Sequence, residues 1–462
     1  MKVKMLSKSS ADHVRERTSD INKVKRNLDP ELHPLEKPRE YTRAVRAAKL
    51  ERMFAKPFLA SLDGHIDGVY ALAKNPWKLD LMYSGSGDGE IRAWSLSNQA
   101  TIWRKANAHQ GLVSGIIVVP ETTNSFISAG TDKTVKIWSL DQNEPSQNDI
   151  NQLNHNASNT DHILPVSVYS GKEAFLGIDH HRSNSQFATC SSEVSIWDVN
   201  RSQPILNLAY GCDTINSVKL NQSEVNVLAS TGSDRTIVLY DLRMSTPIVK
   251  LTMSLKSNAL SWNPMEPFIF AAANEDHNAY LFDMRKMDHA TNVLKDHVSA
   301  VMDVDFSPTG AELVTSSYDR TIRIFNTASG HSRDVYHTKR MQRVFTTKFS
   351  CDNKFILSAS DDGNLRLWRA QASQRVGSKS NRERSKLEYM DTVKSKFSHL
   401  PQVRKILRQR NLPRDIRKAT LTKRDMIASR KTKENNVRAH SKPGAVPFKS
   451  ERTKNILNVT SK

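Results

Sequence analysis

The middle of the chain repeats one pattern of apolar and polar positions seven times. Each copy has small or polar residues around a turn and then an alternation that ends on an aromatic residue, as in TIRIF at residues 321–325. A period of two predicts β-strands with one buried face. The aromatic residues that end the copies are Trp94, Trp138, Trp197, Tyr240, Phe282, Phe325 and Trp368. The pattern therefore predicts an all-β domain made of seven similar units.

The distances between these aromatic residues identify the kind of repeat. The spacings are 44, 59, 43, 42, 43 and 43 residues. A period of roughly 40–45 residues that closes on a Trp-Asp-like dipeptide is typical of WD repeats, each of which forms a four-stranded propeller blade. The one long spacing contains the polar, Asn-rich residues 141–162, which predict an inserted surface loop. We expect a seven-bladed WD-repeat β-propeller over residues 57–370.

Polar residues recur with the strands. Six copies have an Asp six residues before the aromatic residue, where a tight turn lets its carboxylate accept backbone N–H bonds; the third copy has Ser191 instead. Three copies have a His 28 or 29 residues before the aromatic residue. Similarity to WD-repeat proteins implies that each His bonds to the turn Asp and, where present, to the Trp indole. The residues expected in these structural networks are His65, Asp88, Trp94, His109, Asp132, Trp138, His297 and Asp319.

The segment PFLASL at residues 57–62 precedes the first His and has no blade of its own. It can supply the outer strand of the last blade and so join the two ends of the ring. Such closure leaves no central strand edge unpaired. We therefore expect the first and last parts of the propeller to share one blade.

Charge divides the chain into three parts. The net charge is +20, of which residues 1–56 contribute +7, residues 57–370 contribute −5 and residues 371–462 contribute +18. A mildly acidic propeller thus lies between a basic N-terminal arm and a basic C-terminal region. This asymmetry predicts a polyanionic partner that the two extensions reach.

The two extensions have weak helical patterns. In the arm, Tyr41, Val45, Ala48 and Met53 can share one face of a helix near residues 39–54. The C-terminal region begins with a stripe that consists of Leu387, Met390, Val393 and Phe397. A short helix then opens at Pro401, Pro413 breaks it, and a third helix runs from about 414 to 432. We expect a mostly helical region that is too thinly apolar to form a core by itself.

The segment PQVRKILRQRNLPRDIRK, residues 401–418, carries much of the basic charge. We expect Val403, Ile406 and Leu407 to form a docking face. Basic side chains along helices suit phosphate contacts. The residues expected to contact RNA or a partner are Arg404, Lys405, Arg408, Arg410, Arg414, Arg417, Lys418, Lys423 and Arg424. Few aromatic residues accompany them, so sequence-specific RNA recognition is not predicted. The alternative is a solvated surface or a nuclear import signal, such as KVKR at 23–26 or RKTK at 430–433.

The sequence contains no motif that indicates catalysis, a metal or a cofactor. SGSGDG at 84–89 lacks the GK[ST] of a phosphate loop. Asp179, His180 and His181 have no second ligand cluster at a recognised spacing. The three cysteines are far apart and suit a reducing compartment as buried residues. No secretory signal or membrane span is predicted, and we expect a scaffold with no catalytic residues and no small-molecule substrate.

The flanking segments resemble the SOF-domain WD-repeat family. The resemblance rests on REYTRAVRAAKLERMFAKPF before the first blade, and on LPQVRKILRQRNLPRDIRK and HSKPGAVPFKSE in the tail. It implies a nuclear and nucleolar protein of the small-subunit processome, which assembles on pre-ribosomal RNA together with a box C/D small nucleolar ribonucleoprotein. The implied role is a non-enzymatic one in 18S ribosomal RNA maturation and 40S subunit assembly, with pre-ribosomal RNA and other processome proteins as partners.

A second class of function stays open from the sequence. The pairs Asp241 and Arg243, and Asp283 and Arg285, resemble the Asp-x-Arg boxes of WD-repeat substrate receptors in cullin-type ubiquitin ligases. The simpler interpretation is two repeat ends that each carry an exposed Arg. An adaptor protein of such a ligase would be the partner if the boxes are functional.

Overall fold

The computed structural model describes residues 35–461 apart from 123, 141–162, 211–212, 245 and 375–376. The chain separates into two compact units. One unit draws on the chain up to Pro57 and on Gln371–Asn411, and the other contains Phe58–Ala370 and Leu412–Lys462. The predicted C-terminal region 371–462 is therefore divided between the two units. The inserted loop predicted at 141–162 lies outside the described residues.

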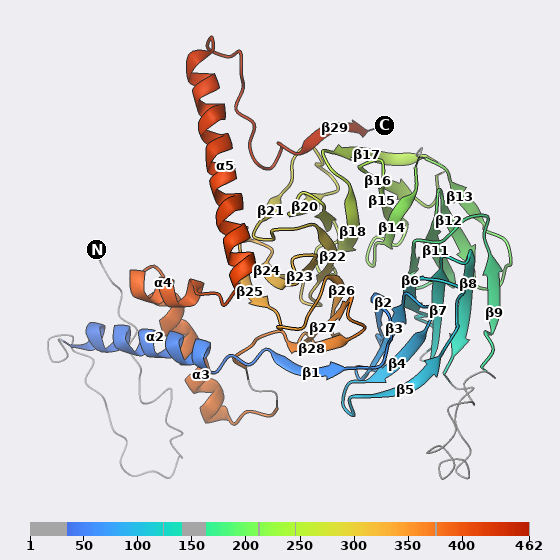
Figure 1. Ribbon diagram of the computed structural model, residues 1–462, viewed down its shortest axis with the longest axis horizontal. Coiled ribbons are helices and arrows are strands. Elements are labelled where there is room, and N and C mark those ends of the chain that lie inside the picture. The colour runs from blue at the N-terminus through green and yellow to red at the C-terminus, as the bar shows by residue number, and fades with distance from the viewer. Residues whose placement is uncertain are drawn as a thin grey trace, which may run out of the picture. The chain divides into compact units, whose positions relative to one another are not determined.

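The second unit is a ring of seven antiparallel sheets (Figure 1). From the inner to the outer strand, the first three blades are β2 (Val69–Lys74), β3 (Leu81–Ser86), β4 (Ile91–Ser95) and β5 (Ala100–Lys105); β6 (Val113–Val118), β7 (Ser125–Gly130), β8 (Thr134–Ser139) and β9 (Ser167–Ser170); and β10 (Gly177–His180), β11 (Gln186–Cys190), β12 (Val194–Asp198) and β13 (Leu206–Leu208).

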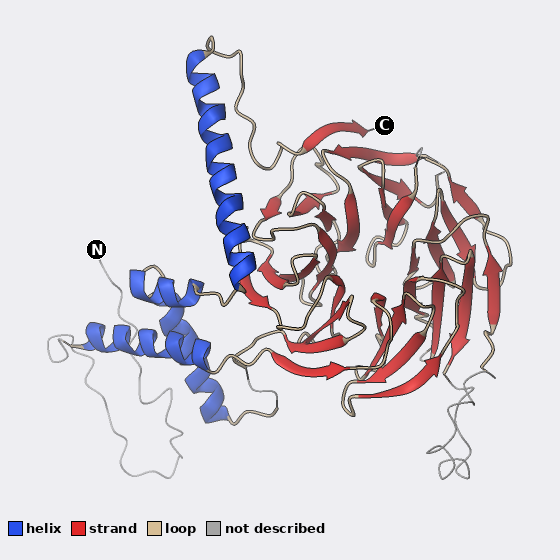
Figure 2. Ribbon diagram, in the orientation of Figure 1, coloured by secondary structure: helices blue, strands red, loops and turns tan. Residues whose placement is uncertain are grey.

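The next three blades continue in the same order. They are β14 (Ile215–Leu220), β15 (Val227–Gly232), β16 (Thr236–Asp241) and β17 (Pro247–Met253); β18 (Ser257–Trp262), β19 (Ile269–Asn274), β20 (Ala279–Asp283) and β21 (Asn292–Leu294); and β22 (Val301–Phe306), β23 (Glu312–Ser317), β24 (Ile322–Asn326) and β25 (Ser332–Tyr336). Figure 2 shows that these blades are built from strands and loops alone. The prediction of a seven-bladed WD-repeat propeller is confirmed.

The last blade closes the ring with the first strand of the chain. Its strands are β26 (Val344–Phe349), β27 (Phe355–Ser360), β28 (Leu365–Arg369) and β1 (Phe58–Leu62). β1 pairs antiparallel with β28, so that Phe58 lies opposite Trp368 and Leu62 opposite Leu365. The expected closure by residues 57–62 is therefore present in the structure.

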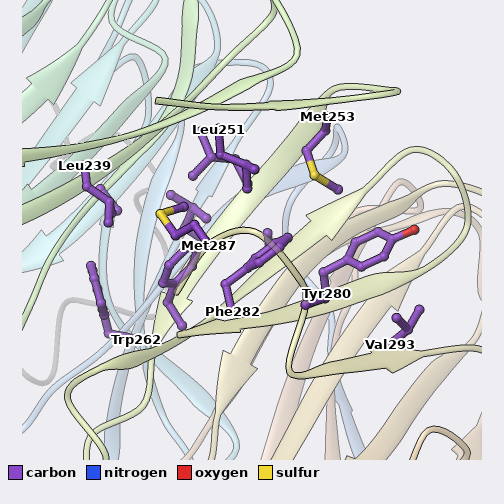
Figure 3. Close-up of a cluster of buried hydrophobic side chains, with 14 residues drawn as sticks. Leu239, Leu251, Met253, Trp262, Tyr280, Phe282, Met287 and Val293 are labelled. Atoms are coloured by element: carbon purple, nitrogen blue, oxygen red, sulfur yellow. The ribbon is translucent and has the colours of Figure 1, made fainter. Parts of the chain in front are cut away.

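The apolar core lies between neighbouring blades. Each aromatic residue that marks a repeat is buried, and Trp94, Trp138 and Trp368 are among the largest fully buried side chains. Figure 3 shows one such cluster, in which Leu239, Leu251 and Met253 of one blade face side chains of the next. The facing residues are Trp262, Tyr280, Phe282, Met287 and Val293. Because each blade buries its face only against its neighbours, the ring needs all of its blades.

The first unit is a small helical assembly. It contains α2 (Glu36–Met53), α3 (Asn381–Lys396) and α4 (Pro401–Arg408). α2 begins three residues before the predicted helix near 39–54, and its buried face contains Ala44 and Ala48. Met53 was expected on this face, but 68% of its surface is exposed.

Two further elements follow in the propeller unit. α5 (Arg414–His440) begins where predicted but extends eight residues beyond the expected end at 432. β29 (Ile456–Ser461), which the sequence pattern does not predict, adds to β17 as a fifth strand, with Leu251 opposite Val459. Within the described residues, no helix combines the length and hydropathy that crossing a bilayer requires.

Candidate nucleic-acid and partner interfaces

The N-terminal half of α5 has one side toward the propeller. Ile416, Ala419, Thr420 and Lys423 are partly buried, and their spacing of i, i+3, i+4 and i+7 places them on one helical face. Lys423 Nζ donates to the carbonyl oxygen of His297 at 2.7 Å. Burial lowers the pKa of Lys423, and Arg323 lowers it further, while nearby carboxylates oppose the shift. Lys423 thus fixes the helix to the blade that contains β22.

The opposite side of this half-helix is basic and exposed. Arg414, Arg417, Lys418 and Arg424 are all exposed. At 3.6 residues per turn their Cα positions fall within about a third of the helix circumference. Along the whole of α5 there are nine Lys or Arg residues and three acidic ones, and none of its 27 described residues is buried. We call the four exposed residues the α5 basic face, a surface whose charge suits phosphate groups.

The C-terminal half of α5 is held by the chain that returns from it. The Arg438 guanidinium lies 4.9 Å from the centroid of the Phe448 ring. Lys431 Nζ lies 2.8 Å from Glu451, and Glu451 also pairs with Lys295 of the propeller. β29 then anchors the returning segment on β17. Together with the Lys423 bond, these contacts fix both halves of α5.

The nine predicted tail residues are not equivalent in the structure. Arg404, Lys405 and Arg408 are exposed on α4, in the helical unit. Arg410 instead donates through Nη1 to the carbonyl oxygens of Leu407 at 2.7 Å and Gln409 at 3.1 Å. Like Lys423, it is therefore engaged within the protein.

The predicted docking face packs against the chain's own N-terminal helix. Val403 is fully buried in a cluster with Ala44, Ala48, Val393 and Phe397, and Ile406 and Leu407 are partly buried against the same cluster. Ion pairs flank it: Lys396 Nζ lies 3.0 Å from Glu40, and Lys394 Nζ lies 2.8 Å from Glu51. α2 thus supplies the apolar surface that the tail helices lack.

The second blade has the expected His109–Asp132 pair, and a serine also takes part in its network. His109 Nδ1 lies 3.0 Å from Asp132, and its Nε2 lies 2.7 Å from Ser128 Oγ. Trp138 Nε1 donates to the same Ser128 oxygen at 2.9 Å. The His and the indole therefore meet through Ser128, which the sequence analysis did not single out.

In the first blade, the prediction that His65 bonds to Asp88 is wrong. His65 Nδ1 lies 2.9 Å from Glu90 Oε2, while exposed Asp88 accepts a hydrogen bond from the Glu90 backbone N–H at 3.1 Å. Burial would raise the pKa of Glu90, but hydrogen bonds from His65, Arg92 and Arg104 lower it to about 2. Because buried Glu90 gathers three cationic or polar partners, it replaces the turn Asp in this blade.

A third network lies beneath α5. His297 Nδ1 lies 2.9 Å from Asp319, and its Nε2 lies 2.7 Å from Thr315 Oγ1. Phe325 has no N–H, so no indole joins this network. Burial opposes ionisation of Asp319, but His297, Arg323 and Thr321 together keep its pKa well below the usual range.

The two Asp-x-Arg pairs are equivalent in the fold. Arg243 pairs with Asp241, with Nη2–Oδ2 at 2.9 Å, and Arg285 pairs with Asp283 at 2.8 Å. Asp241 ends β16 and Asp283 ends β20, the third strands of adjacent blades, so both pairs lie on the same face of the ring. Both arginine side chains are mainly exposed, and Arg285 also lies over the Phe268 ring.

The described residues contain no group of three or more His, Cys, Asp or Glu that could hold a metal ion. Asp179 is engaged by Lys219 Nζ at 3.0 Å and by the Leu220 N–H at 2.7 Å. His180 Nδ1 lies 2.6 Å from the His181 carbonyl oxygen. Burial raises the pKa of the Cys190 thiol to about 12, which disfavours a reactive thiolate. These residues thus serve the packing of the blade.

The seven blades and their repeated hydrogen-bond networks define a WD-repeat β-propeller. Four segments, 56–95, 102–139, 289–326 and 327–369, match the WD domain, G-beta repeat, and residues 370–456 match the Sof1-like domain. The chain is 47% identical to Protein SOF1 of Saccharomyces cerevisiae, over 100% of this chain and 96% of that protein. It is 48% identical to DDB1- and CUL4-associated factor 13 of Xenopus tropicalis and of Homo sapiens, over 99% of this chain and 100% of each relative. The chain belongs to the Sof1-like family of WD-repeat proteins.

Proposed function

We propose that this protein is a non-enzymatic ribosome-biogenesis factor. It acts in the nucleolus as a scaffold of the small-subunit processome and is needed for 18S ribosomal RNA maturation and 40S subunit assembly. The 47% sequence identity to Protein SOF1, over 100% of this chain, supports the assignment, since the resemblance to the SOF-domain family implies a role in the processome. The single observation that carries the RNA contact is the α5 basic face, a set of four exposed cations on a helix fixed to the propeller by Lys423.

In this proposal, the propeller faces bind proteins and the α5 basic face binds RNA. The propeller presents rigid faces on which other processome proteins and the box C/D ribonucleoprotein can assemble. The α5 basic face presents point charges and bidentate guanidinium groups to the phosphates of pre-ribosomal RNA, contacts that fix position without reading sequence. Arg404, Lys405 and Arg408 of α4 extend the basic surface of the helical unit.

Reversing the α5 basic face should strongly weaken RNA binding by the full-length protein. We expect the variant Arg414→Glu, Arg417→Glu, Lys418→Glu and Arg424→Glu to lose association with pre-ribosomes on sucrose gradients. If each residue neutralises one phosphate, the slope of log affinity against log salt should become shallower by about 3 to 4. Fluorescence anisotropy with a labelled RNA between 50 and 200 mM salt measures this slope.

The matched control reverses four exposed cations elsewhere on the propeller: Lys133, Lys172, Arg201 and Arg235. It changes the net charge equally but leaves α5 intact, so we expect it to retain pre-ribosome association and most of the salt slope. Equal losses in both variants would show that bulk charge, rather than the α5 basic face, determines RNA binding. Normal association of the α5 variant would contradict the proposed function of this helix.

The alternative function is that of a substrate receptor of a cullin-type ubiquitin ligase. Its support is the name of the vertebrate relatives, DDB1- and CUL4-associated factor 13, together with the two adjacent Asp–Arg pairs on one face of the ring. If these arginines contact an adaptor, Arg243→Glu combined with Arg285→Glu should abolish capture of purified DDB1 and leave pre-ribosome association unchanged.

The control for the ligase hypothesis is Lys133→Glu combined with Arg235→Glu. These residues precede β8 and β16, so they lie at the opposite ends of third strands from the Asp–Arg pairs. This control variant should bind DDB1 as well as the unmodified protein does. Failure of the unmodified protein to capture DDB1 would eliminate the alternative, and equal capture by the Arg243 and Arg285 variant would exclude this surface.

A further inference from the structure

An aromatic cluster lies at the ends of the innermost strands of two neighbouring blades. The rings of Tyr70, on β2, and Phe345, on β26, are stacked with centroids 4.3 Å apart. Tyr318, in the turn between β23 and β24, contacts Phe345 edge-on with centroids 6.0 Å apart. Tyr318 keeps 37% of its surface exposed. The stack therefore fixes the position of Tyr318 and leaves part of the side chain available to a ligand.

Two exposed arginines lie beside this tyrosine. The Arg343 guanidinium is 5.5 Å from the centroid of the Tyr318 ring, within the range of a cation–π contact. Arg320 follows Tyr318 by two residues in the same turn and is exposed. Burial, Asp361 and Asp67 raise the pKa of the neighbouring Tyr70, while Arg343 lowers it. The Tyr318 turn thus carries one exposed cation, Arg320, and has a second, Arg343, over its ring.

The same turn is connected to α5 through successive hydrogen bonds. Asp319, between Tyr318 and Arg320, bonds to His297, and the His297 carbonyl oxygen accepts the bond from Lys423. The Tyr318 turn and the N-terminal half of α5 therefore meet at one blade. Arg323 of β24 is also close enough to Lys423 to lower the pKa of its ammonium group.

We propose that Tyr318, Arg320 and Arg343 bind an unpaired nucleotide of the RNA held by the α5 basic face. The base stacks on Tyr318, and the two arginines contact the adjoining phosphates. This inference rests on the proposed RNA-binding function and adds a preference for single-stranded RNA next to the helix. Base stacking was not expected from the basic tail, because α5 has no aromatic residue, but the fold brings one from the propeller.

A nucleotide suits this surface better than a basic peptide. Arg343 lies over the Tyr318 ring and Arg320 is exposed in the same turn, so both cations attract phosphate and repel an incoming Lys or Arg. Stacking on an aromatic side chain also tolerates any base, which agrees with contacts that position RNA without reading its sequence.

The test measures binding of full-length protein to a labelled single-stranded 20-nucleotide RNA of mixed sequence and to its fully paired duplex. Tyr318→Ala should weaken binding of the single strand by about 5- to 150-fold, the range found for loss of one stacked base. It should leave duplex binding within about twofold, because a paired base cannot stack on the ring. Tyr318→Phe keeps the ring and should match the unmodified protein.

Tyr210→Ala is the matched control, since Tyr210 is also exposed but lies in the loop after β13. Ultraviolet crosslinking should place the single strand on the tryptic peptide that ends at Arg320. Unchanged single-strand affinity of Tyr318→Ala, while the α5 reversal strongly weakens binding, would overturn the inference and leave the proposed function intact. Tyr318-dependent capture of an arginine-rich peptide, with no loss of RNA affinity, would also overturn it.

Discussion

Asp319→Ala should lower the free energy of unfolding by about 3–5 kcal/mol, because it leaves the buried donors of His297, Val298 and Thr321 without their acceptor at about 1–3 kcal/mol each. Asp319 is almost fully buried and binds His297 and the Thr321 hydroxyl. Without it, the His297 ring loses its acceptor, and buried Arg323 keeps only Asp296 of the two carboxylates that stabilise its charge. Guanidinium unfolding followed by tryptophan fluorescence measures the change.

Asp88→Ala is the matched control for this prediction. Asp88 has the same place in its repeat, but it is exposed and His65 bonds to Glu90 instead. Removing the bond that it accepts from the Glu90 N–H should cost about 1 kcal/mol or less. Equal losses for Asp88→Ala and Asp319→Ala would mean that the turn position itself, rather than the buried pair, determines stability.

Val403→Asp should unfold the helical unit, with a loss of about 3–5 kcal/mol. The substitution removes a fully buried side chain and places an unpaired carboxylate between Ala44, Ala48 and Phe397. Hydrogen exchange should show the result as lost amide protection in α2, α3 and α4. The propeller strands should keep theirs, because Val403 belongs to the other compact unit.

Val437→Asp provides the comparison for the same chemical change. Val437 lies on α5 with 54% of its surface exposed, so a carboxylate there stays hydrated and should change stability by no more than about 0.5 kcal/mol. Retained protection in α2 to α4 of the Val403→Asp protein would show that the cluster does not stabilise these helices.

The ring could be predicted because its information is local and repeated. Alternation fixes each strand, and the recurring Trp or other aromatic residue fixes the blade period. β1 could be placed because a closed ring needs a partner for β28. β29 could not, because Ile456, Val459 and their neighbours form one short apolar stretch whose partner strand, β17, is set only by the path of the folded chain.

The candidate sites were less predictable because they depend on the length of each side chain and on the direction in which it points. Spacing suggested Asp88 for His65, but the longer Glu90 side chain reaches the imidazole ring from two residues further along the chain. Charge alone grouped Lys423 with Arg424, although adjacent helical residues point about 100° apart and only Arg424 points outward. Tyr318 gave no signal at all, since the cluster forms only when the next repeat brings Phe345 to it and the closed ring brings Tyr70 of the first blade to Phe345.

The pairing of β1 with β28 sets an order of events during synthesis on the ribosome. Phe58 cannot pair until Trp368 has been synthesised, which is 368 − 58 = 310 residues later in the chain. At about 5–20 residues per second, the interval is roughly 15–60 s. The interval is longer for α2, because α3 and α4, which complete its apolar cluster, are synthesised after β28. Throughout this time, the apolar strand FLASL and the alanine face of α2 have no native partner, so nascent chains are the form most exposed to chaperones and to aggregation. A chain that ended before β28 would remain in that state.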